Sequence, residues 1–168
     1  MSQVRRQSLD LGDTVFALAS GSLPCAVAIL RLSGPGAFAF AEKHFRPVSG
    51  TWKPLRGMLF GVIIDAEGRE IDSGLLLTFV GPHSFTGQNV LEIQCHGSVA
   101  IVSQIESLFV QLGFRPAERG EFSFRAFHGN KLSPNALEAL GDVFLARQPA
   151  DLGRIYGRRD SSHDKEIE

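Results

Sequence analysis

Apolar positions along this chain repeat with two different spacings, and each spacing predicts a different kind of element. Continuous or alternating apolar runs, which are typical of strands, occur at residues 14–19, 25–32, 55–64, 71–80 and 90–95. Apolar residues three or four positions apart, which are typical of helices, occur at residues 37–45, at residues 99–112 and after Ser133-Pro134. The interleaving of strands and helices predicts a mixed α/β fold of the α+β type, with helices packed on a sheet.

Both ends of the chain are polar. Residues 1–12 lack an apolar pattern and are predicted to form a flexible N-terminus. From Gln148 onward, charged residues crowd a segment that has little to bury, so residues 148–168 are predicted to be a disordered tail. The folded part of the chain is therefore expected between these two segments.

The composition mainly excludes several classes of protein. Among 168 residues, 17 Lys and Arg balance 18 Asp and Glu, and this near-neutral charge argues against a general nucleic-acid-binding protein. The two cysteines, Cys25 and Cys95, lie far apart in the sequence and exclude a disulfide scaffold. No apolar run has the ~18 residues of a membrane helix, and Asp10 and Asp13 interrupt any signal-peptide core. We therefore expect a cytoplasmic protein without membrane contact.

Two charged residues interrupt the predicted strands. Arg31 follows six apolar residues, and a guanidinium near the end of a buried strand needs a partner, either an internal carboxylate or a bound anion. Glu92 lies in a strand of strict alternation, on the same predicted face as Gln94 and His96. That face is either the solvated side of a strand or a polar floor beneath a ligand. A carboxylate suits the second role because it accepts two parallel hydrogen bonds from a heterocycle.

Two further segments carry candidate binding residues. Residues 81–87 form a dense turn with two hydroxyls and one aromatic ring, as loops that line binding sites often do. Residues 119–131 interleave three Phe with several cations. They form either a short helix that buries Phe122 and Phe127 with its charges outward, or a surface that binds bases and phosphates. The cations available to such an RNA-binding module are Arg119, Arg125, His128 and Lys131.

Several chemistries lack their motifs in this sequence. The chain has no G-x-x-x-x-G-K-[ST] phosphate loop, so we do not expect it to bind or hydrolyse GTP. No G-x-G-x-x-G follows a predicted strand, and the histidines show no zinc-ligand spacing. Neither a bound metal nor a bound nucleotide is expected, and no catalytic residue is assigned.

Five motifs occur in a fixed order, at residues 13–19, 27–35, 81–93, 96–97 and 120–132. The most specific segments are Ser84-Phe85-Thr86-Gly87, Gly120-Glu121-Phe122, Arg125-Ala126-Phe127 and Asn130-Lys131-Leu132. In this order the motifs resemble the N-terminal domain of the tRNA modification GTPase family MnmE/TrmE. The resemblance covers roughly residues 13–147.

The resemblance implies a fold like that of the tetrahydrofolate-binding domains of aminomethyltransferases. It also implies a homodimer that holds a 5-formyltetrahydrofolate-type cofactor as the one-carbon donor. The family's folate contacts fall on Arg31, Glu92 and Lys131 of this sequence. Glu92 would accept hydrogen bonds from the pterin, Arg31 would donate to a carbonyl or carboxylate, and Lys131 would attract the glutamate tail. The implied partners are tRNA, modified at C5 of its wobble uridine, and an FAD-dependent MnmG-like protein.

By this resemblance, residues 13–131 form the folate-binding and dimerisation domain, and residues 132–147 begin a central helical domain. The GTPase domain is absent from the chain, so we expect a truncated module that is inactive alone. Three alternatives stay open: a stand-alone folate-dependent enzyme resembling aminomethyltransferases, an RNA-binding module, and a dimerisation remnant without a ligand. Folate turnover, salt-dependent tRNA binding, or a dimer indifferent to folate would distinguish them.

Overall fold

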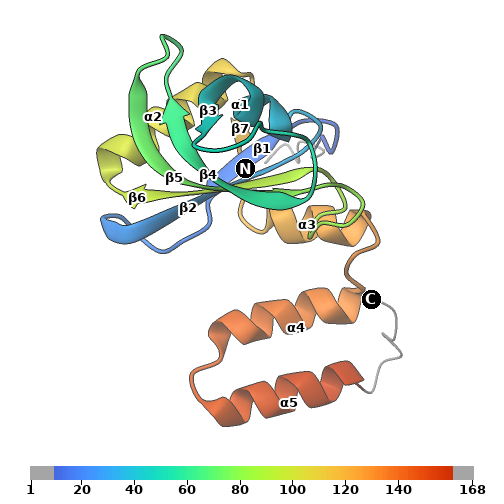
Figure 1. Cartoon of the computed structure of the whole chain (residues 1–168). Helices are drawn as coiled ribbons and strands as arrows, with labels where there is room; N and C mark the ends of the chain where they lie inside the picture. Colours follow the sequence, from blue (N-terminus) through green and yellow to red (C-terminus); the bar gives the residue numbers. More distant parts are fainter. Residues whose placement is uncertain (1–9, 161–168) are drawn as a thin grey trace, which may run out of the picture.

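One sheet organises the chain in the computed structural model, which describes residues 10–160 (Figure 1). The strand order across the sheet is β3-β4-β5-β6-β2-β1-β7. Neighbouring strands are antiparallel, except that β1 and β7 run parallel. The strands are β1 (Val15–Leu18), β2 (Cys25–Ser33), β3 (Phe45–Pro47), β4 (Gly57–Ile64), β5 (Glu70–Phe79), β6 (Val90–Gly97) and β7 (Arg115–Pro116).

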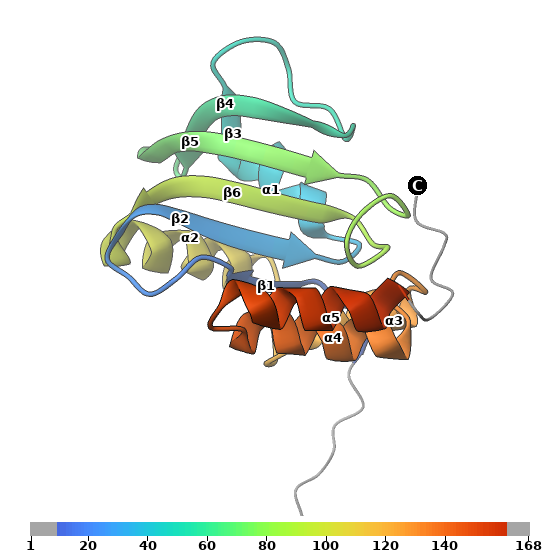
Figure 2. The ribbon, with the colours of Figure 1, turned by 90° about the horizontal axis from the view of Figure 1, so that it is seen from below.

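The helices divide into a pair that covers the sheet and a group at its other side. Figure 2 shows α1 and α2 behind the sheet, while the opposite face of β4, β5, β6 and β2 is open to view. The helix α3 follows β7, and a helical hairpin of α4 and α5 projects on the side of the open face (Figures 1 and 2). The helices are α1 (Ala37–His44), α2 (Val99–Gln111), α3 (Glu121–His128), α4 (Pro134–Leu145) and α5 (Pro149–Asp160).

The hydrophobic core lies between the sheet and the helices α1 and α2. In β6 the predicted alternation is confirmed, because Leu91, Ile93 and Cys95 are at most 4% exposed and belong to this core. The residues between them point to the open face. Cys95 packs in this core as a small apolar side chain, and its burial raises the pKa of the thiol to about 11. One side of the sheet is thus used for stability, and the other is available for binding.

All strands and helices predicted from periodicity are present, with ends shifted by a few residues. Two short strands were not predicted. Strand β3 starts at Phe45, which was predicted to belong to the first helix; that helix ends at His44, and β3 pairs with β4. Strand β7 has only two residues and is defined by its pairing with β1. Strands of two or three residues are too short to show an apolar periodicity in the sequence. They are recognised only by their pairing with a neighbouring strand.

The prediction of a disordered tail is wrong over the helix α5, Pro149–Asp160. The Asp151 carboxylate accepts the backbone N–H groups of Arg147 and Gln148 and so satisfies donors at the start of this helix. In addition, Ile155 is only 5% exposed, and α5 packs along α4. The segment thus has an apolar residue to bury and a carboxylate at its start, which its charged composition concealed. The end of the predicted tail, residues 161–168, lies outside the described residues.

The prediction of a flexible N-terminus is likewise wrong for residues 10–12. The carbonyl of Asp10 accepts a hydrogen bond from Arg125, and the carbonyl of Leu11 accepts one from Gln88. Both donors are side chains from distant parts of the domain, which the local sequence pattern could not indicate. The rest of the predicted N-terminal segment, residues 1–9, lies outside the described residues.

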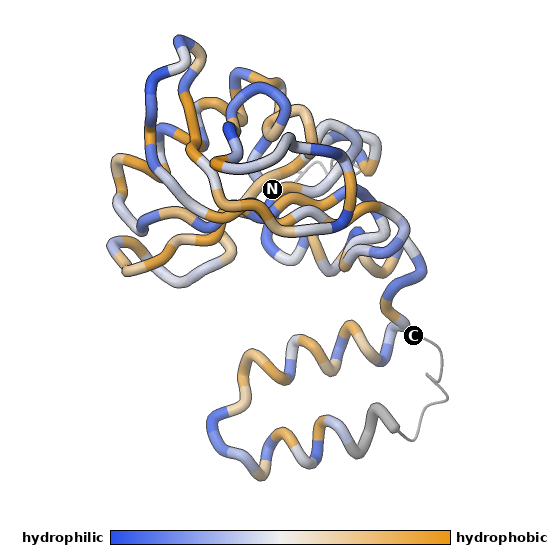
Figure 3. The backbone as a smooth tube through the Cα atoms, viewed as in Figure 1, coloured by the Kyte–Doolittle hydropathy of each residue, from blue (hydrophilic) through white to orange (hydrophobic). Residues whose placement is uncertain are grey.

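The helical hairpin of residues 134–160 is called the arm below. Its first helix starts as predicted, because Ser133 Oγ accepts the N–H of Ala136 and Pro134 occupies the first turn. Figure 3 shows hydrophobic positions along α4 as well as in the sheet domain. Within residues 10–160, no helix is both long and apolar enough to cross a membrane.

Candidate functional site

Arg31 and Glu92 lie directly opposite each other on the neighbouring strands β2 and β6. The guanidinium Nε donates to Glu92 Oε1 at 2.8 Å, and Nη2 lies 2.6 Å from the same oxygen. The predicted internal carboxylate partner of Arg31 is therefore present, and it is the other candidate residue. The antiparallel register brings together two residues that are 61 positions apart in the sequence.

The ion pair borders a cavity of about 390 Å³ with a largely aromatic lining. The Arg31 guanidinium lies 5.8 Å from the ring centre of Phe85 and 5.6 Å from that of Phe122. Contacts of this kind orient the cation and keep it partly desolvated. The cavity is lined by Arg31, Phe79, Phe85, Val90, Glu92, Phe122, Ser123, Leu140 and Phe144. A charged pair among aromatic rings suits a flat, polar heterocycle.

The two oxygens of Glu92 are used unequally. Both contacts from Arg31 go to Oε1, and Oε2 accepts no hydrogen bond from the residues that the structure describes. The Glu92 side chain is 16% exposed, so this carboxylate is mostly shielded from bulk water. A ligand with adjacent N–H groups would find an acceptor here whose position is already fixed by Arg31.

Lys131, the third predicted contact, lies apart from the cavity lining. Its backbone N–H donates to the Ala126 carbonyl at 2.8 Å, at the end of α3. Its side chain passes over Gly87, where an added Cβ would lie 3.6 Å from Lys131 Cγ and Cε. Gly87 belongs to the same loop as Phe85, which does line the cavity. Lys131 is thus a neighbour of the cavity's loop, and its role as a ligand contact stays a prediction.

A second charged cluster holds α3 in place beside the cavity. Glu121 is 1% exposed and Arg125 is 2% exposed, whereas Phe122 and Phe127 are only half-buried. The expected short helix is confirmed, but the expectation that its charges point outward is wrong for Glu121 and Arg125. The charges are buried because each one meets a partner, including Asp13, which accepts from Arg125 across 112 positions of sequence. Arg125 is consequently inaccessible to phosphates, contrary to the RNA-binding alternative.

The carboxylate of Glu121 is saturated with hydrogen bonds. Its Oε1 accepts from Arg115 Nη2 at 2.8 Å and from Arg125 Nε at 3.0 Å, and its Oε2 accepts from Arg115 Nη1 at 2.9 Å. The Glu118 N–H donates to Oε2 at 2.8 Å. Burial alone would raise the pKa of Glu121, but these donors overcome that effect and hold the pKa at about 2.

Hydrogen bonds extend from this cluster into the loop that carries Phe85. Arg125 Nη1 donates to Gln88 Oε1 at 3.1 Å, and Ser33 Oγ donates to the same oxygen at 2.9 Å. Ser33 and Thr86 also share a hydrogen bond of 2.7 Å between their hydroxyls. The cluster thus fixes the elements bearing Phe122 and Phe85, the two rings beside Arg31.

His96 does not contribute to the cavity. Its ring Nδ1 lies 2.8 Å from Asp72 Oδ1, and its backbone N–H donates to Asp72 Oδ2 at 2.7 Å. It lies four positions along the strand from Glu92, a span of about 13 Å. Of the two residues named as a possible acid or base for a stand-alone enzyme, Glu92 and His96, only Glu92 is among the described residues that line the cavity. Within residues 10–160, no group of three or more His, Cys, Asp or Glu could hold a metal ion.

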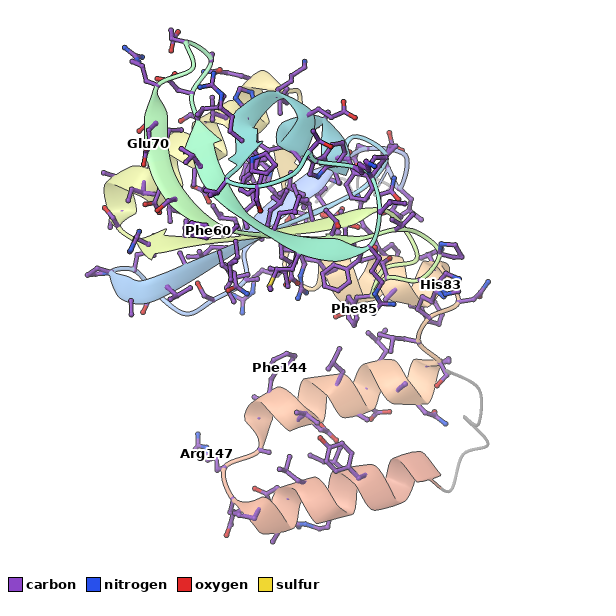
Figure 4. All side chains as sticks on the ribbon, viewed as in Figure 1. Phe60, Glu70, His83, Phe85, Phe144 and Arg147 are labelled. Carbon is purple, nitrogen blue, oxygen red and sulfur yellow. The ribbon has the colours of Figure 1, made fainter. Side chains whose placement is uncertain are left out.

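The aromatic lining was the part of the site that the sequence did not reveal. Phe85 lay in a loop noted for its turn composition, Phe122 was expected either in the core or in a base-binding surface, and Phe79 was expected within a strand. Leu140 and Phe144 were recognised only as the apolar face of a helix. A signal existed for Phe85 and Phe122, since both lie within the most specific motifs. Figure 4 shows Phe144 projecting from α4 toward the sheet domain, on the side where Phe85 lies.

A comparison with known families adds to this geometry. The sequence model described as "GTP-binding protein TrmE N-terminus" matches residues 14–131. The chain belongs to this TrmE N-terminal family. The matched region contains both candidate strands, the Phe85 loop and all of α3. The arm lies beyond it.

Curated relatives of this TrmE N-terminal domain carry one name. A protein from Ruegeria sp. called tRNA modification GTPase MnmE is 40% identical over 139 residues, covering 82% of this chain and 32% of the relative. Its namesake from Rhizobium meliloti is 44% identical over 135 residues, covering 80% and 30%. The one from Granulibacter bethesdensis is 35% identical over 156 residues, covering 93% and 34%. The chain therefore spans about a third of the length of these relatives.

Proposed function

We propose that this domain binds a 5-formyltetrahydrofolate-type cofactor in the cavity beside Arg31 and Glu92. The observation that carries the proposal is the ion pair itself, which borders an aromatic cavity of about 390 Å³ and leaves Glu92 Oε2 free of described partners. A cavity of this size lies in the range typical of small-molecule sites. The mixed α/β sheet is compatible with a tetrahydrofolate-binding-domain-like fold.

The chemistry of the ligand matches the chemistry of these side chains. Glu92 would accept hydrogen bonds from the exocyclic amino group and a ring N–H of the pterin. Arg31 would donate to a carbonyl or carboxylate oxygen of the cofactor, and the rings of Phe85 and Phe122 would pack on its faces. Lys131 would attract the glutamate tail from the neighbouring loop. The domain itself would hold and orient the one-carbon donor.

The test is calorimetric titration with 5-formyltetrahydrofolate. Glu92→Gln keeps the size of the side chain but replaces one acceptor with a donor and removes the charge. We expect about 100-fold weaker binding, since one hydrogen bond to the ligand is lost and the other is no longer assisted by a charge. Glu70→Gln is the matched control, because Glu70 is an exposed acidic residue on β5 at the far end of the sheet domain (Figure 4). A folded wild-type chain that does not bind folate would refute the proposal.

In the longer proteins, we propose that this domain serves tRNA modification as the folate-binding module. Support comes from the relatives' common name and from the family's matched region. The expected partners are tRNA, modified at C5 of the wobble uridine, and an FAD-dependent MnmG-like protein. Reconstitution with such a partner would test this role: the isolated chain should bind folate but leave tRNA unmodified.

We further propose that the domain forms a homodimer through the open face of its sheet. Met58 and Phe60 of β4 are 62% and 53% exposed on this face, and they pair in register with Leu77 and Leu75 of β5. Contiguous exposed apolar side chains of this kind mark interaction surfaces. Phe60→Glu should convert the dimer to a monomer in sedimentation velocity. Val110→Glu on α2, where Val110 is 57% exposed, should leave it intact.

A further inference from the structure

The helix α4 presents an apolar face that its own arm does not bury. None of its residues is buried, and Phe144 is 80% exposed although α4 packs along α5. A large exposed aromatic ring costs free energy in water unless something covers it. A ligand or another part of the protein is therefore expected to cover this face of α4.

The cavity supplies a specific answer, because its lining comes from two separate parts of the chain. Arg31, Glu92 and Phe122 belong to the matched domain, whereas Leu140 and Phe144 belong to the arm. Phe144 projects from α4 toward the sheet domain (Figure 4). Its neighbour Leu145 is equally exposed, at 78%, but is absent from the cavity lining. The exposed face of α4 is therefore directed at the ligand site through particular residues.

We infer that α4 forms the second wall of the ligand site and that Phe144 packs on the bound cofactor. This inference rests on the proposed folate binding and adds a contact from outside the matched domain. A folate carries a second aromatic ring joined to its pterin, and Leu140 and Phe144 line the same cavity as the ion pair. With the pterin at Glu92, that second ring would pack between Phe144 and Leu140 on one side and Phe122 on the other.

This arrangement couples the arm to the ligand. The arm joins the domain through the short segment between α3 and α4, residues 129–133, so its contacts with the domain are few. A ligand held by both parts fixes their relative position. By reciprocity, any change that moves the arm away from the sheet also weakens ligand binding. The affinity of the domain for the ligand thus depends on the position of the arm.

The first test compares two neighbouring exposed residues. Phe144→Ala should weaken binding of 5-formyltetrahydrofolate about tenfold, because a ring contact is lost. Leu145→Ala removes a side chain of similar exposure from the same helix and should change the affinity less than twofold. Neither change removes a buried group, so both variants should keep the wild-type circular dichroism spectrum.

The second test reports on contact directly. The chain has one tryptophan, Trp52, whose indole N–H makes no hydrogen bond within the described residues, so Trp52→Phe sacrifices none. In that background, Phe144→Trp should show a saturable emission change with the ligand at concentrations that leave Leu145→Trp unchanged.

The outcomes separate this inference from the proposed function. If the wild-type chain binds folate but Phe144→Ala matches it and the Phe144→Trp emission is unaffected, the inference is wrong and the folate site stands. If the wild-type chain does not bind folate at all, the proposed function is wrong, and the inferred contact between α4 and folate is wrong with it. Weakening by Phe144→Ala together with the emission change would establish the arm as part of the site.

Discussion

Two arginine–carboxylate clusters beside the cavity, Arg31 with Glu92 and Arg125 with Glu121, differ in how fully their polar atoms form hydrogen bonds. Both oxygens of Glu121 accept several hydrogen bonds, and the cluster is nearly inaccessible to solvent. In the other cluster only Oε1 of Glu92 is engaged, and the Arg31 side chain is 30% exposed. The two clusters have similar composition but different remaining capacity for hydrogen bonds.

This difference separates a structural role from a binding role. A saturated, buried network specifies one arrangement of the chain and offers nothing to a ligand. A pair with a free oxygen at the edge of a cavity can accept a ligand without first breaking its own bonds. The saturated cluster also holds in place the elements that carry Phe85 and Phe122, and so it stabilises the shape of the cavity. Composition alone could not have told the two clusters apart.

The largest expected effect is on stability. Arg125→Met should cost about 3–5 kcal/mol of the free energy of unfolding, because the buried carboxylate of Glu121 loses one of its two arginine partners and Asp13 loses a charged donor. Arg31→Met should cost only about 1–2 kcal/mol, since Glu92 can still reach water, but it should weaken folate binding strongly. Urea denaturation of both variants measures the contrast. Equal losses of stability would contradict the assignment of separate roles.

The saturated cluster should also be visible in the pH dependence of stability. The pKa of Glu121 is lowered from 4.5 to about 2 in the folded protein. Its contribution is therefore fully present above pH 4.5 and is lost as the pH falls toward 2, with a total of about 3 kcal/mol. Urea denaturation between pH 2 and 6 should show this loss, and Glu121→Gln should flatten it. An unchanged slope in that variant would mean that other carboxylates dominate.

Much of the fold was accessible from the sequence because it depends on local periodicity. The alternation in β6 indicated Glu92 as a candidate residue, and the apolar run of β2 indicated Arg31. The sequence did not show that the two residues pair with each other. The burial of Arg125 was mispredicted because its partner Asp13 lies 112 positions away. Helix α5 was missed because its docking rests on few local contacts, chiefly Ile155 and the Asp151 cap.

The candidate site follows the same division. Its polar half could be predicted, since charged residues in apolar strands are conspicuous in any sequence. Its aromatic half could not be predicted, because the sequence pattern of a Phe at helical spacing is the same whether the ring faces a core, a cavity or solvent. Phe122 and Phe144 became site residues only when the chain brought α3 and α4 beside the same strands.

The smallest expected effect concerns Lys131, which tests how far the site extends beyond its lining. If Lys131 attracts the glutamate tail across solvent, Lys131→Ala should weaken 5-formyltetrahydrofolate binding about three- to fivefold at low salt, and the difference should fade as salt is raised. A pterin ligand without the glutamate tail is the control, because it should bind the variant and the wild type equally. Titrations with both ligands at two salt concentrations decide the matter. If the variant loses the same affinity for both ligands, Lys131 acts by shaping the Gly87 loop that it covers, and the site ends at the cavity lining.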